Sequence, residues 1–180
     1  STGTLSNGVA YVSGNGGSWD FDGVDDFIDT TFTLPAGDRS MEFWVYYNTL
    51  TSTAGNGYSL MGVQQGADKY LYSGIQSNGS GYSYAGNTGG AYSYTFSAAT
   101  WYHIALAMGS GTSRNYVNGE QVATKTYTSS SASTTEVMIG AINQQHEIDG
   151  LIPLTRVYNK ELSATEVTQN YNAQKSRFGL

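Results

Sequence analysis

The sequence predicts an all-β fold, a sandwich or a barrel, with one short helix near its C-terminal end. Five Asn-Gly pairs divide the chain, and both residues tolerate the positive φ that tight hairpin turns require. The segments between them are short and rich in aromatic and β-branched residues, many of which alternate between two faces. Many short strands at such spacing are typical of a sandwich or a barrel.

The strand signal is clearest in five segments: 41–47, 101–108, 114–124, 136–142 and 150–158. In the first segment Met41 and Phe43 share a face, because successive strand residues point to opposite sides. The third segment is a hairpin turned by Asn118-Gly119. Pro153 interrupts the last segment, and we expect it at an edge or a bulge because proline cannot donate a hydrogen bond to a ladder.

The helix signal lies near the end of the chain. Ser163 is an N-cap residue and Glu166 follows three residues later, which is the spacing of a capping box. Leu162 and Val167 occupy the hydrophobic staple positions on either side of this cap. We therefore expect a short helix over residues 163–172, including its cap.

The composition excludes several classes of protein. The chain has 180 residues, which fits one domain, and only eight Lys and Arg residues against fourteen acidic ones, for a net charge of −6. This balance argues against a nucleic-acid partner, which needs clustered cations. No apolar run approaches the length of a membrane span, so we expect no membrane insertion. The absence of cysteine excludes disulfides and thiol catalysis.

A tyrosine-rich segment at residues 81–96 is the first candidate binding surface. A five-residue loop at 86–90 would pair the strands so that four tyrosines form a ladder on one face, namely Tyr82, Tyr84, Tyr92 and Tyr94. That face either packs against a second sheet or lies exposed as an aromatic platform for sugar rings or a partner protein. The residues between the tyrosines are Ser, Gly and Ala, which are too small to build a core on the opposite face.

Five aspartates within ten residues, in the segment "SWDFDGVDDFIDT" at 18–30, raise the question of a metal site. An EF-hand loop is excluded, because counting from Asp20 places Gly23 at position 4 and Thr31 at position 12. Asp22-Gly23 is itself a turn-forming pair. We interpret the cluster as mainly structural and keep Asp22 and Asp25 as candidate ligands of calcium.

Four segments in this order resemble the laminin-G-like, concanavalin A-like jelly-roll family, in the group shared with pentraxins. They are "GGSWDFDGVDDFIDT", "RSMEFWVYY", "WYHIALAM…YVNGEQVAT" and "IGAINQQHEIDGLIPLTRVYNKELSATEVTQNYNAQ", and the resemblance covers residues 17–175. It implies a sandwich of two antiparallel sheets with a short helix near the end. It also implies bound calcium in some members, with Asn143 and Glu147 as further candidate ligands here.

The resemblance also predicts how the chain is organised. We expect one laminin-G-like domain over residues 1–180, with a lead-in strand or arm at 1–16 and a tail at 173–180. The N-terminal segment "TLSNGVAYVSGNGGS" and the C-terminal segment "LSATEVTQNYNAQKSRFGL" resemble a narrower group, the laminin-G-like domains of tailed-phage virion proteins. In those proteins the domain continues upstream, so the chain is expected to be a C-terminal fragment or a processed product.

The predicted function is binding rather than catalysis. We expect a virion surface protein of a tailed phage, such as a head decoration, fibre or tail-tip domain. Its expected partners are other virion proteins or further copies of itself, and a cell-surface glycan. The alternative is a secreted, extracellular carbohydrate-binding or adhesin module of a bacterium.

A glycoside hydrolase is the remote alternative. The segment "HEIDG" at 146–150 resembles the acidic motif of jelly-roll hydrolases, in which Glu, Asp and Glu alternate along one strand. Glu147 and Asp149 fit the first two places, but Leu151 or Ile152 occupies the third and cannot transfer a proton. We therefore expect no enzyme activity. His103, in the middle of a predicted strand, is interpreted as a structural residue.

Overall fold

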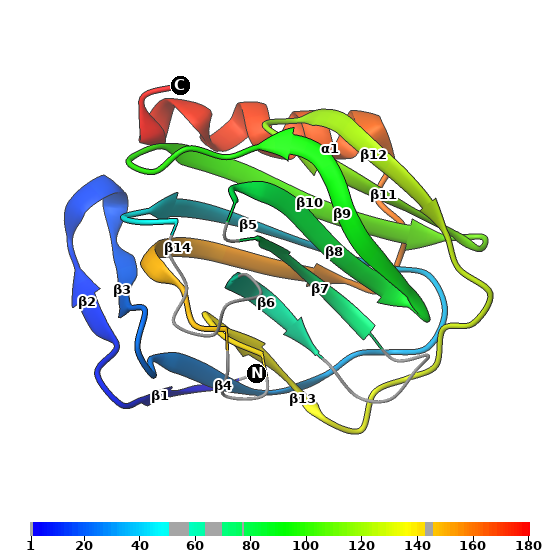
Figure 1. Ribbon diagram of the computed structural model, residues 1–180, viewed down its shortest axis with the longest axis horizontal. Coiled ribbons are helices and arrows are strands. Elements are labelled where there is room, and N and C mark those ends of the chain that lie inside the picture. The colour runs from blue at the N-terminus through cyan, green and yellow to red at the C-terminus, as the bar shows by residue number, and fades with distance from the viewer. Residues whose placement is uncertain (1, 51–57, 64–69, 77, 143–145) are drawn as a thin grey trace.

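The structure is a computed structural model that describes residues 2–50, 58–63, 70–76, 78–142 and 146–180. Two seven-stranded sheets pack face to face, and helix α1 lies against the outside of one of them (Figure 1). All neighbouring strands are antiparallel. The predicted antiparallel jelly-roll sandwich with a short C-terminal helix is thereby confirmed. No helix in the described part of the chain is long and apolar enough to span a membrane.

Sheet A has the strand order β1-β4-β13-β6-β7-β8-β9. In that order its strands are Gly3–Ser6, Phe27–Thr33, Glu136–Ile139, Tyr58–Val63, Tyr70–Ile75, Ser80–Gly86 and Thr88–Thr95. Its last three strands follow one another in the sequence, so a single meander builds the edge that ends in β9 (Figure 1).

Sheet B has the strand order β12-β11-β10-β5-β14-β3-β2. In that order its strands are Glu120–Thr126, Thr112–Val117, Trp101–Gly109, Arg39–Tyr47, Asp149–Tyr158, Ser18–Asp22 and Ala10–Val12. The described residues also form three helical segments: η1 (Gly14–Gly16), α1 (Ala164–Gln174) and η2 (Lys175–Phe178).

The five predicted strand segments correspond to β5, β10, the β11–β12 hairpin, β13 and β14. Pro153 lies inside β14, between two partner strands, where the register against β5 shifts between Leu151 and Leu154. The expectation that Pro153 sits at a bulge is therefore confirmed. A bulge leaves one residue outside the hydrogen-bonded ladder, so a proline there, which has no backbone N–H, costs no ladder hydrogen bond.

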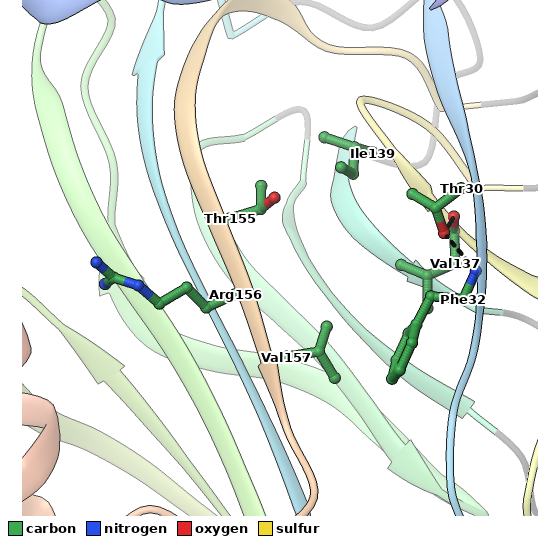
Figure 2. A pocket seen from close by; sticks show the side chains of 7 residues that line it. All are labelled: Thr30, Phe32, Val137, Ile139, Thr155, Arg156 and Val157. Atoms are coloured by element: carbon green, nitrogen blue, oxygen red, sulfur yellow. Dashed lines mark hydrogen bonds between the residues drawn. The ribbon is translucent and has the colours of Figure 1, made fainter. Parts of the chain in front are cut away.

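A groove separates the two sheets where β14 faces β4 and β13 (Figure 2). Thr155 and Val157 of β14 form one wall, and Phe32 lies across from them on β4. Arg156 turns to the other face of β14, where its guanidinium pairs with Glu42 at 2.7 Å. The groove is therefore lined mainly by uncharged side chains.

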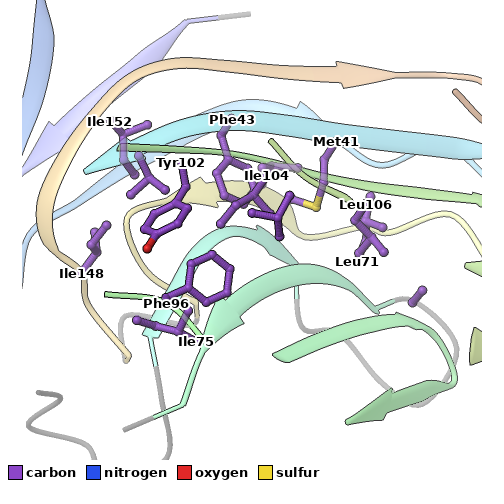
Figure 3. Close-up of a cluster of buried hydrophobic side chains, with 14 of the residues drawn as sticks. Met41, Phe43, Leu71, Ile75, Phe96, Tyr102, Ile104, Leu106, Ile148 and Ile152 are labelled. Atoms are coloured by element: carbon purple, nitrogen blue, oxygen red, sulfur yellow. The ribbon is translucent and has the colours of Figure 1, made fainter. Parts of the chain in front are cut away.

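The core lies between the sheets, and the face that Met41 and Phe43 were expected to share points into it (Figure 3). Met41 and Phe43 of β5 point into it beside Ile104 and Leu106 of β10, and all four are at most 1 % exposed. The strands of sheet A contribute the opposing wall, which includes Leu71.

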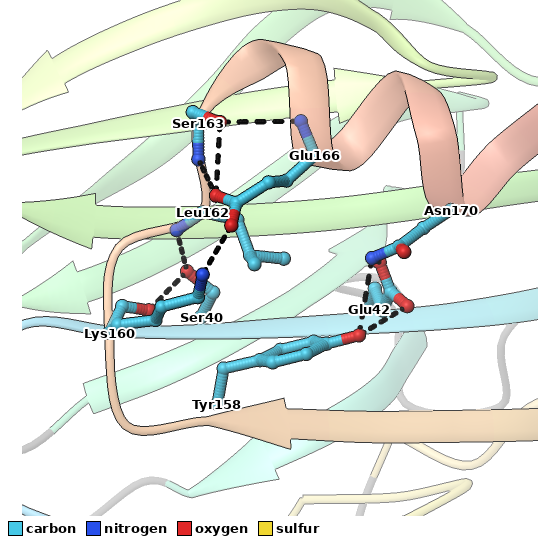
Figure 4. Close-up of polar contacts among 8 residues, drawn as sticks. All are labelled: Ser40, Glu42, Tyr158, Lys160, Leu162, Ser163, Glu166 and Asn170. Atoms are coloured by element: carbon cyan, nitrogen blue, oxygen red, sulfur yellow. Dashed lines mark hydrogen bonds and ion pairs between the residues drawn. The ribbon is translucent and has the colours of Figure 1, made fainter.

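Helix α1 begins with the predicted capping box (Figure 4). The Ser163 hydroxyl accepts a hydrogen bond from the Glu166 backbone N–H, and the Glu166 carboxylate accepts one from the Ser163 N–H. The helix ends at Gln174, two residues beyond the expected limit at 172. Val167 is fully buried and packs with Leu162 against the outer face of sheet B.

Candidate functional site

The tyrosine-rich segment forms a hairpin, but its predicted register is wrong. Ala85 pairs with Thr88 and Tyr84 with Gly89, so the chain turns through Gly86 and Asn87 instead of a five-residue loop. Gly86 has φ of +57°, and this left-handed conformation lets the chain reverse within two residues. Repeated small residues in both strands make several registers sterically acceptable, and the turn selects one of them.

The change of register places the four tyrosines on two faces. Tyr82 and Tyr84 point outward from sheet A, because Ser83 and Ala85 between them are buried between the sheets. On β9, Tyr92 points inward and is only 6 % exposed. A slip by an odd number of residues exchanges the two faces of a strand, so the predicted four-tyrosine ladder does not form.

Tyr94 follows Tyr92 on the inward side of β9. Its ring is half-buried and packs against the core, 4.8 Å from the ring centre of Phe96. Tyr92 and Tyr94 therefore belong to the interior of the sandwich, and only Tyr82 and Tyr84 remain as candidate contact residues.

A third tyrosine joins these two from the neighbouring strand. Tyr72 of β7 pairs with Tyr84 across the ladder, and their ring centres lie 5.5 Å apart. The ring centres of Tyr72 and Tyr82 lie 6.2 Å apart with planes inclined by 18°. These three side chains are called the tyrosine face below. The sequence analysis missed Tyr72, although its alternation with Tyr70 in "YLYSGI" is a strand signal.

Glycines make the tyrosine face flat. Gly74 pairs with Tyr82, and Gly89 pairs with Tyr84, so the cross-strand position carries no side chain in either case. The Tyr84 ring lies over Gly89: a Cβ added there would be 2.0 Å from Tyr84 Cδ2. The ring therefore lies along the sheet rather than standing away from it.

Lys125 of β12 fixes the hairpin from its inner side. Its ammonium donates hydrogen bonds to the carbonyl oxygens of Ser83, at 3.3 Å, and of Gly90. Burial lowers the pKa of Lys125 to about 8. Because these bonds join the edge strand of sheet B to both strands of the hairpin, they hold the base of the tyrosine face in place.

The aspartate cluster builds the connection from β3 to β4, as expected. Asp22 Oδ1 accepts a hydrogen bond from the Val24 N–H at 2.9 Å, and Gly23 has φ of +76°. The Asp26 side chain folds inward and accepts a hydrogen bond from the Asp22 N–H at 3.0 Å. Asp26 is 2 % exposed, and burial raises the pKa of its carboxyl group.

Part of the cluster suits a hard cation. Asp22, Asp25 and Asp26 each offer a carboxylate oxygen, and these oxygens lie within 4.8 Å of one another. Calcium prefers such oxygens but takes six to eight of them. These three residues would hold the ion, whose charge would offset their mutual repulsion. Of the predicted loop ligands, Glu147 does not join this group among the described residues, and Asn143 lies outside them.

The carboxylates of the "HEIDG" segment do not form an open pair. Glu147 is only 8 % exposed. The two Asp149 oxygens accept hydrogen bonds from the Asn48 amide at 2.9 Å and the Thr49 hydroxyl at 2.8 Å. Asp149 therefore ties the start of β14 to the end of β5, which is a structural role.

Relatives of known structure share this architecture. A structure of domain 4 of AbnA, an extracellular arabinanase of Geobacillus stearothermophilus, in complex with arabinotriose, is 18 % identical with a TM-score of 0.72, covering 93 % of this chain and 86 % of that one. The receptor binding domain of botulinum neurotoxin D is 13 % identical with a TM-score of 0.75, covering 96 % of this chain and 48 % of that one. A mutant Trypanosoma rangeli sialidase is 14 % identical with a TM-score of 0.72, covering 97 % and 30 %.

At such identities these likenesses show the fold alone, and the chain spans less than half of the toxin domain and of the sialidase. No curated protein matches the sequence. The family assignment comes from the sequence itself, because residues 21–168 match the Laminin_G_3 family. This chain therefore belongs to the Laminin_G_3 family of the concanavalin A-like lectin/glucanases superfamily.

Proposed function

We propose that this chain is a non-catalytic domain that binds glycans on the tyrosine face. The observation that carries the proposal is the gathering of Tyr72, Tyr82 and Tyr84 from adjoining strands on the outer face of sheet A. A tyrosine ring offers an apolar surface to the C–H face of a sugar, and its hydroxyl can bond the sugar's hydroxyls. Such rings also lose little conformational entropy on binding.

The surroundings of the rings support an extended ligand. Gly74 and Ala91 pair with Tyr82, and Gly89 pairs with Tyr84 on one side, so the long side chain directly opposite either ring is Tyr72, itself part of the tyrosine face. The Tyr82 hydroxyl is protonated at neutral pH and can donate to a sugar, and burial raises its pKa further above the ordinary value. The bound arabinotriose of the arabinanase domain shows that this architecture can serve sugar binding in another protein.

The absence of catalysis is part of the proposal. A retaining hydrolase needs two carboxyl groups about 5–5.5 Å apart and open to substrate. Glu147 is buried and Asp149 is held by two hydrogen-bond donors, while Leu151 occupies the third position of the motif. This arrangement does not support hydrolysis by the "HEIDG" region, and it does not support a binding role for that region either.

We further propose that the domain acts on the surface of a tailed-phage virion, because of the narrow resemblance of both ends of the chain to such proteins. In that setting its partners are other virion proteins or further copies, and the glycan belongs to the host surface. Copurification of the native chain with phage particles tests this location. A secreted bacterial source without particles would instead favour the extracellular carbohydrate-binding module.

A glycan array that includes arabino- and galacto-oligosaccharides first selects the best ligand. Titration calorimetry with that ligand then tests the site. Tyr82→Ala should weaken binding about tenfold or more, equivalent to about 1.4 kcal/mol, while the fold is retained. Gly89→Ala should also weaken it, because the new Cβ displaces the Tyr84 ring without removing any aromatic group.

A matched control distinguishes binding from folding. Gly81 faces inward, and a Cβ there would lie 2.1 Å from the Tyr92 ring. Gly81→Ala should therefore lower the melting temperature but leave the affinity of the remaining folded protein unchanged. Wild-type affinity in both Tyr82→Ala and Gly89→Ala would show that the tyrosine face is not the binding site.

A further inference from the structure

A second pocket lies at the far edge of sheet B, where β2, β3 and η2 meet. Its volume is about 250 Å³, and its walls include Tyr11, Trp19, Pro153 and Arg177. Tyr11 is 64 % exposed, which is the highest exposure among the large hydrophobic residues of the described chain. The Tyr11 and Trp19 rings meet edge to face with centres 5.7 Å apart, so Trp19 fixes the orientation of an exposed ring.

Two glycines form the floor of this pocket. Gly16 and Gly17 have φ of +77° and +98°. A Cβ on Gly17 would lie 2.6 Å from the Tyr11 hydroxyl oxygen, and one on Gly16 would lie 2.9 Å from Arg177 Nε. Tyr11 and Arg177 therefore lie so close to the backbone that a residue with a Cβ would clash with them. The floor between the two side chains is formed by the main chain of the two glycines.

Arg177 brings a positive charge to the pocket. Its Nε and one terminal nitrogen donate hydrogen bonds to the carbonyl oxygens of Asn15 and Gly17, the latter at 2.9 Å. No carboxylate pairs with it among the described residues. A guanidinium has five N–H donors, so three remain for a ligand.

Two further features complete the site. The adjoining Phe178 stacks on Trp44 with ring centres 4.3 Å apart, which anchors η2 and so holds Arg177 in position. Ser18 is one of the lining residues of the same pocket, and its buried hydroxyl has no hydrogen-bond partner within the described part of the chain. Buried hydroxyls are normally bonded, so an unpaired one in a pocket wall suits a polar ligand.

We propose that this pocket binds one acidic sugar unit, with Tyr11 packing against the sugar ring and Arg177 pairing with its carboxylate. The volume lies below the range of about 300–1,000 Å³ typical of sites for drug-sized ligands, which favours a single ring over a longer segment. An arginine fork matches a carboxylate geometrically. The pocket shares no residue with the tyrosine face, so it does not depend on the function proposed above.

The test compares two sugars that differ only at C6. Methyl α-galacturonoside carries a carboxylate there, and methyl α-galactoside carries a hydroxymethyl group. We expect the acid to shift the backbone amide signals of Gly16 and Gly17 and the indole N–H signal of Trp19 in a proton–nitrogen NMR titration. The neutral sugar should bind at least about tenfold more weakly, and rising salt should reduce this difference because it screens the charge pair.

Variants assign the two contacts. Tyr11→Ala should weaken binding of both sugars, whereas Arg177→Gln should remove the preference for the acid and leave weak binding of the neutral one. Arg177 also joins η2 to η1, so the Arg177→Gln variant can fail to fold. In that case the salt dependence of binding to the wild-type protein tests the charge pair instead. Tyr82→Ala should bind the acid as the wild type does. Equal affinity for the two sugars, or shifts that sodium acetate alone reproduces, would overturn the proposal.

Discussion

The two outer faces of the sandwich differ in what covers them. On sheet B, α1 and η2 lie over the strands and bury Glu42 to 1 % exposure (Figures 1 and 4). On sheet A, the outward rings of Tyr72, Tyr82 and Tyr84 are half-buried and pack against one another. Among the residues that the structure describes, one face is thus sealed by a helix and the other presents a cluster of tyrosine side chains.

The difference teaches how each face is stabilised. A carboxylate under a helix is costly unless every oxygen has a partner, and Glu42 receives hydrogen bonds or a close contact from four side chains: His103, Arg156, Tyr158 and Asn170. Tyrosines need no such set, because the ring buries apolar area while the hydroxyl can reach water. A buried carboxylate with a full set of partners is therefore found on the covered face of sheet B, and tyrosine hydroxyls are found on the face of sheet A that is proposed to bind a ligand.

The largest expected effect is on the covered face. Glu42→Ala should lower the free energy of unfolding by about 3–5 kcal/mol, because it leaves the buried His103 and the Arg156 guanidinium without their carboxylate. Urea denaturation monitored by tryptophan fluorescence measures this loss. Glu161→Ala is the control: its pair with Arg114 is partly exposed and should be worth about 0–1 kcal/mol. Equal losses in the two variants would show that Glu42 is not buried as described.

The same carboxylate should make stability depend on pH. Burial alone would raise the pKa of Glu42, but the polar contacts of four side chains, His103 foremost, outweigh it and lower the pKa from 4.5 to about 2. A lowered pKa in the folded state means that the stabilisation is complete above about pH 4.5 and is lost as the pH falls toward 2. Urea titrations at pH 6, 4 and 2.5 should show this loss, and Glu42→Gln should make the curve flatter.

A smaller effect is expected at the cap of the helix. Ser163→Ala removes the acceptor of the Glu166 N–H and should cost about 0.5–2 kcal/mol, the usual worth of an N-cap side chain. Thermal unfolding measures the loss, and Ser163→Asp, which keeps an acceptor, should restore most of it. A melting temperature unchanged by Ser163→Ala would mean that the helix contributes little to sealing its face.

Patterns local in the sequence predicted the covered face well. The alternation in β5 placed Met41 and Phe43 on one face, which is the core face, and the Ser163–Glu166 spacing located the helix start, because each depends on residues close together in the chain. The tyrosine hairpin was harder, since its palindromic spacing allows several registers and one left-handed glycine, Gly86, decides among them.

Contacts between distant segments could not be predicted at all. The pocket beside Tyr11 depends on Arg177, which lies at the other end of the chain and reaches the Gly17 carbonyl only because η2 docks on Trp44. Tyr72 joined the tyrosine face through the pairing of β7 with β8, which no single segment encodes. Motif spacing carries no signal for either arrangement.

The smallest expected effect concerns the aspartate cluster, which offers a second buried carboxylate to compare with Glu42. Asp26 is as buried as Glu42, but its pKa is raised rather than lowered, because burial outweighs the hydrogen bond from the Asp22 N–H. Its neighbours Asp22 and Asp25 are exposed, so water already solvates much of the charge that a cation would neutralise.

We therefore expect calcium to bind weakly, with a Kd on the order of 1 mM, the range of extracellular modules. At 1 mM calcium such a site adds about 0.4 kcal/mol by mass action, or about 1 °C in melting temperature for a chain of this length. Differential scanning fluorimetry with EDTA, calcium and magnesium measures the shift, and Asp25→Asn should abolish it. A rise of several degrees with calcium alone would show that the cluster is a metal site built for the ion, and that a cation replaces the side-chain partners that Glu42 has and Asp26 lacks.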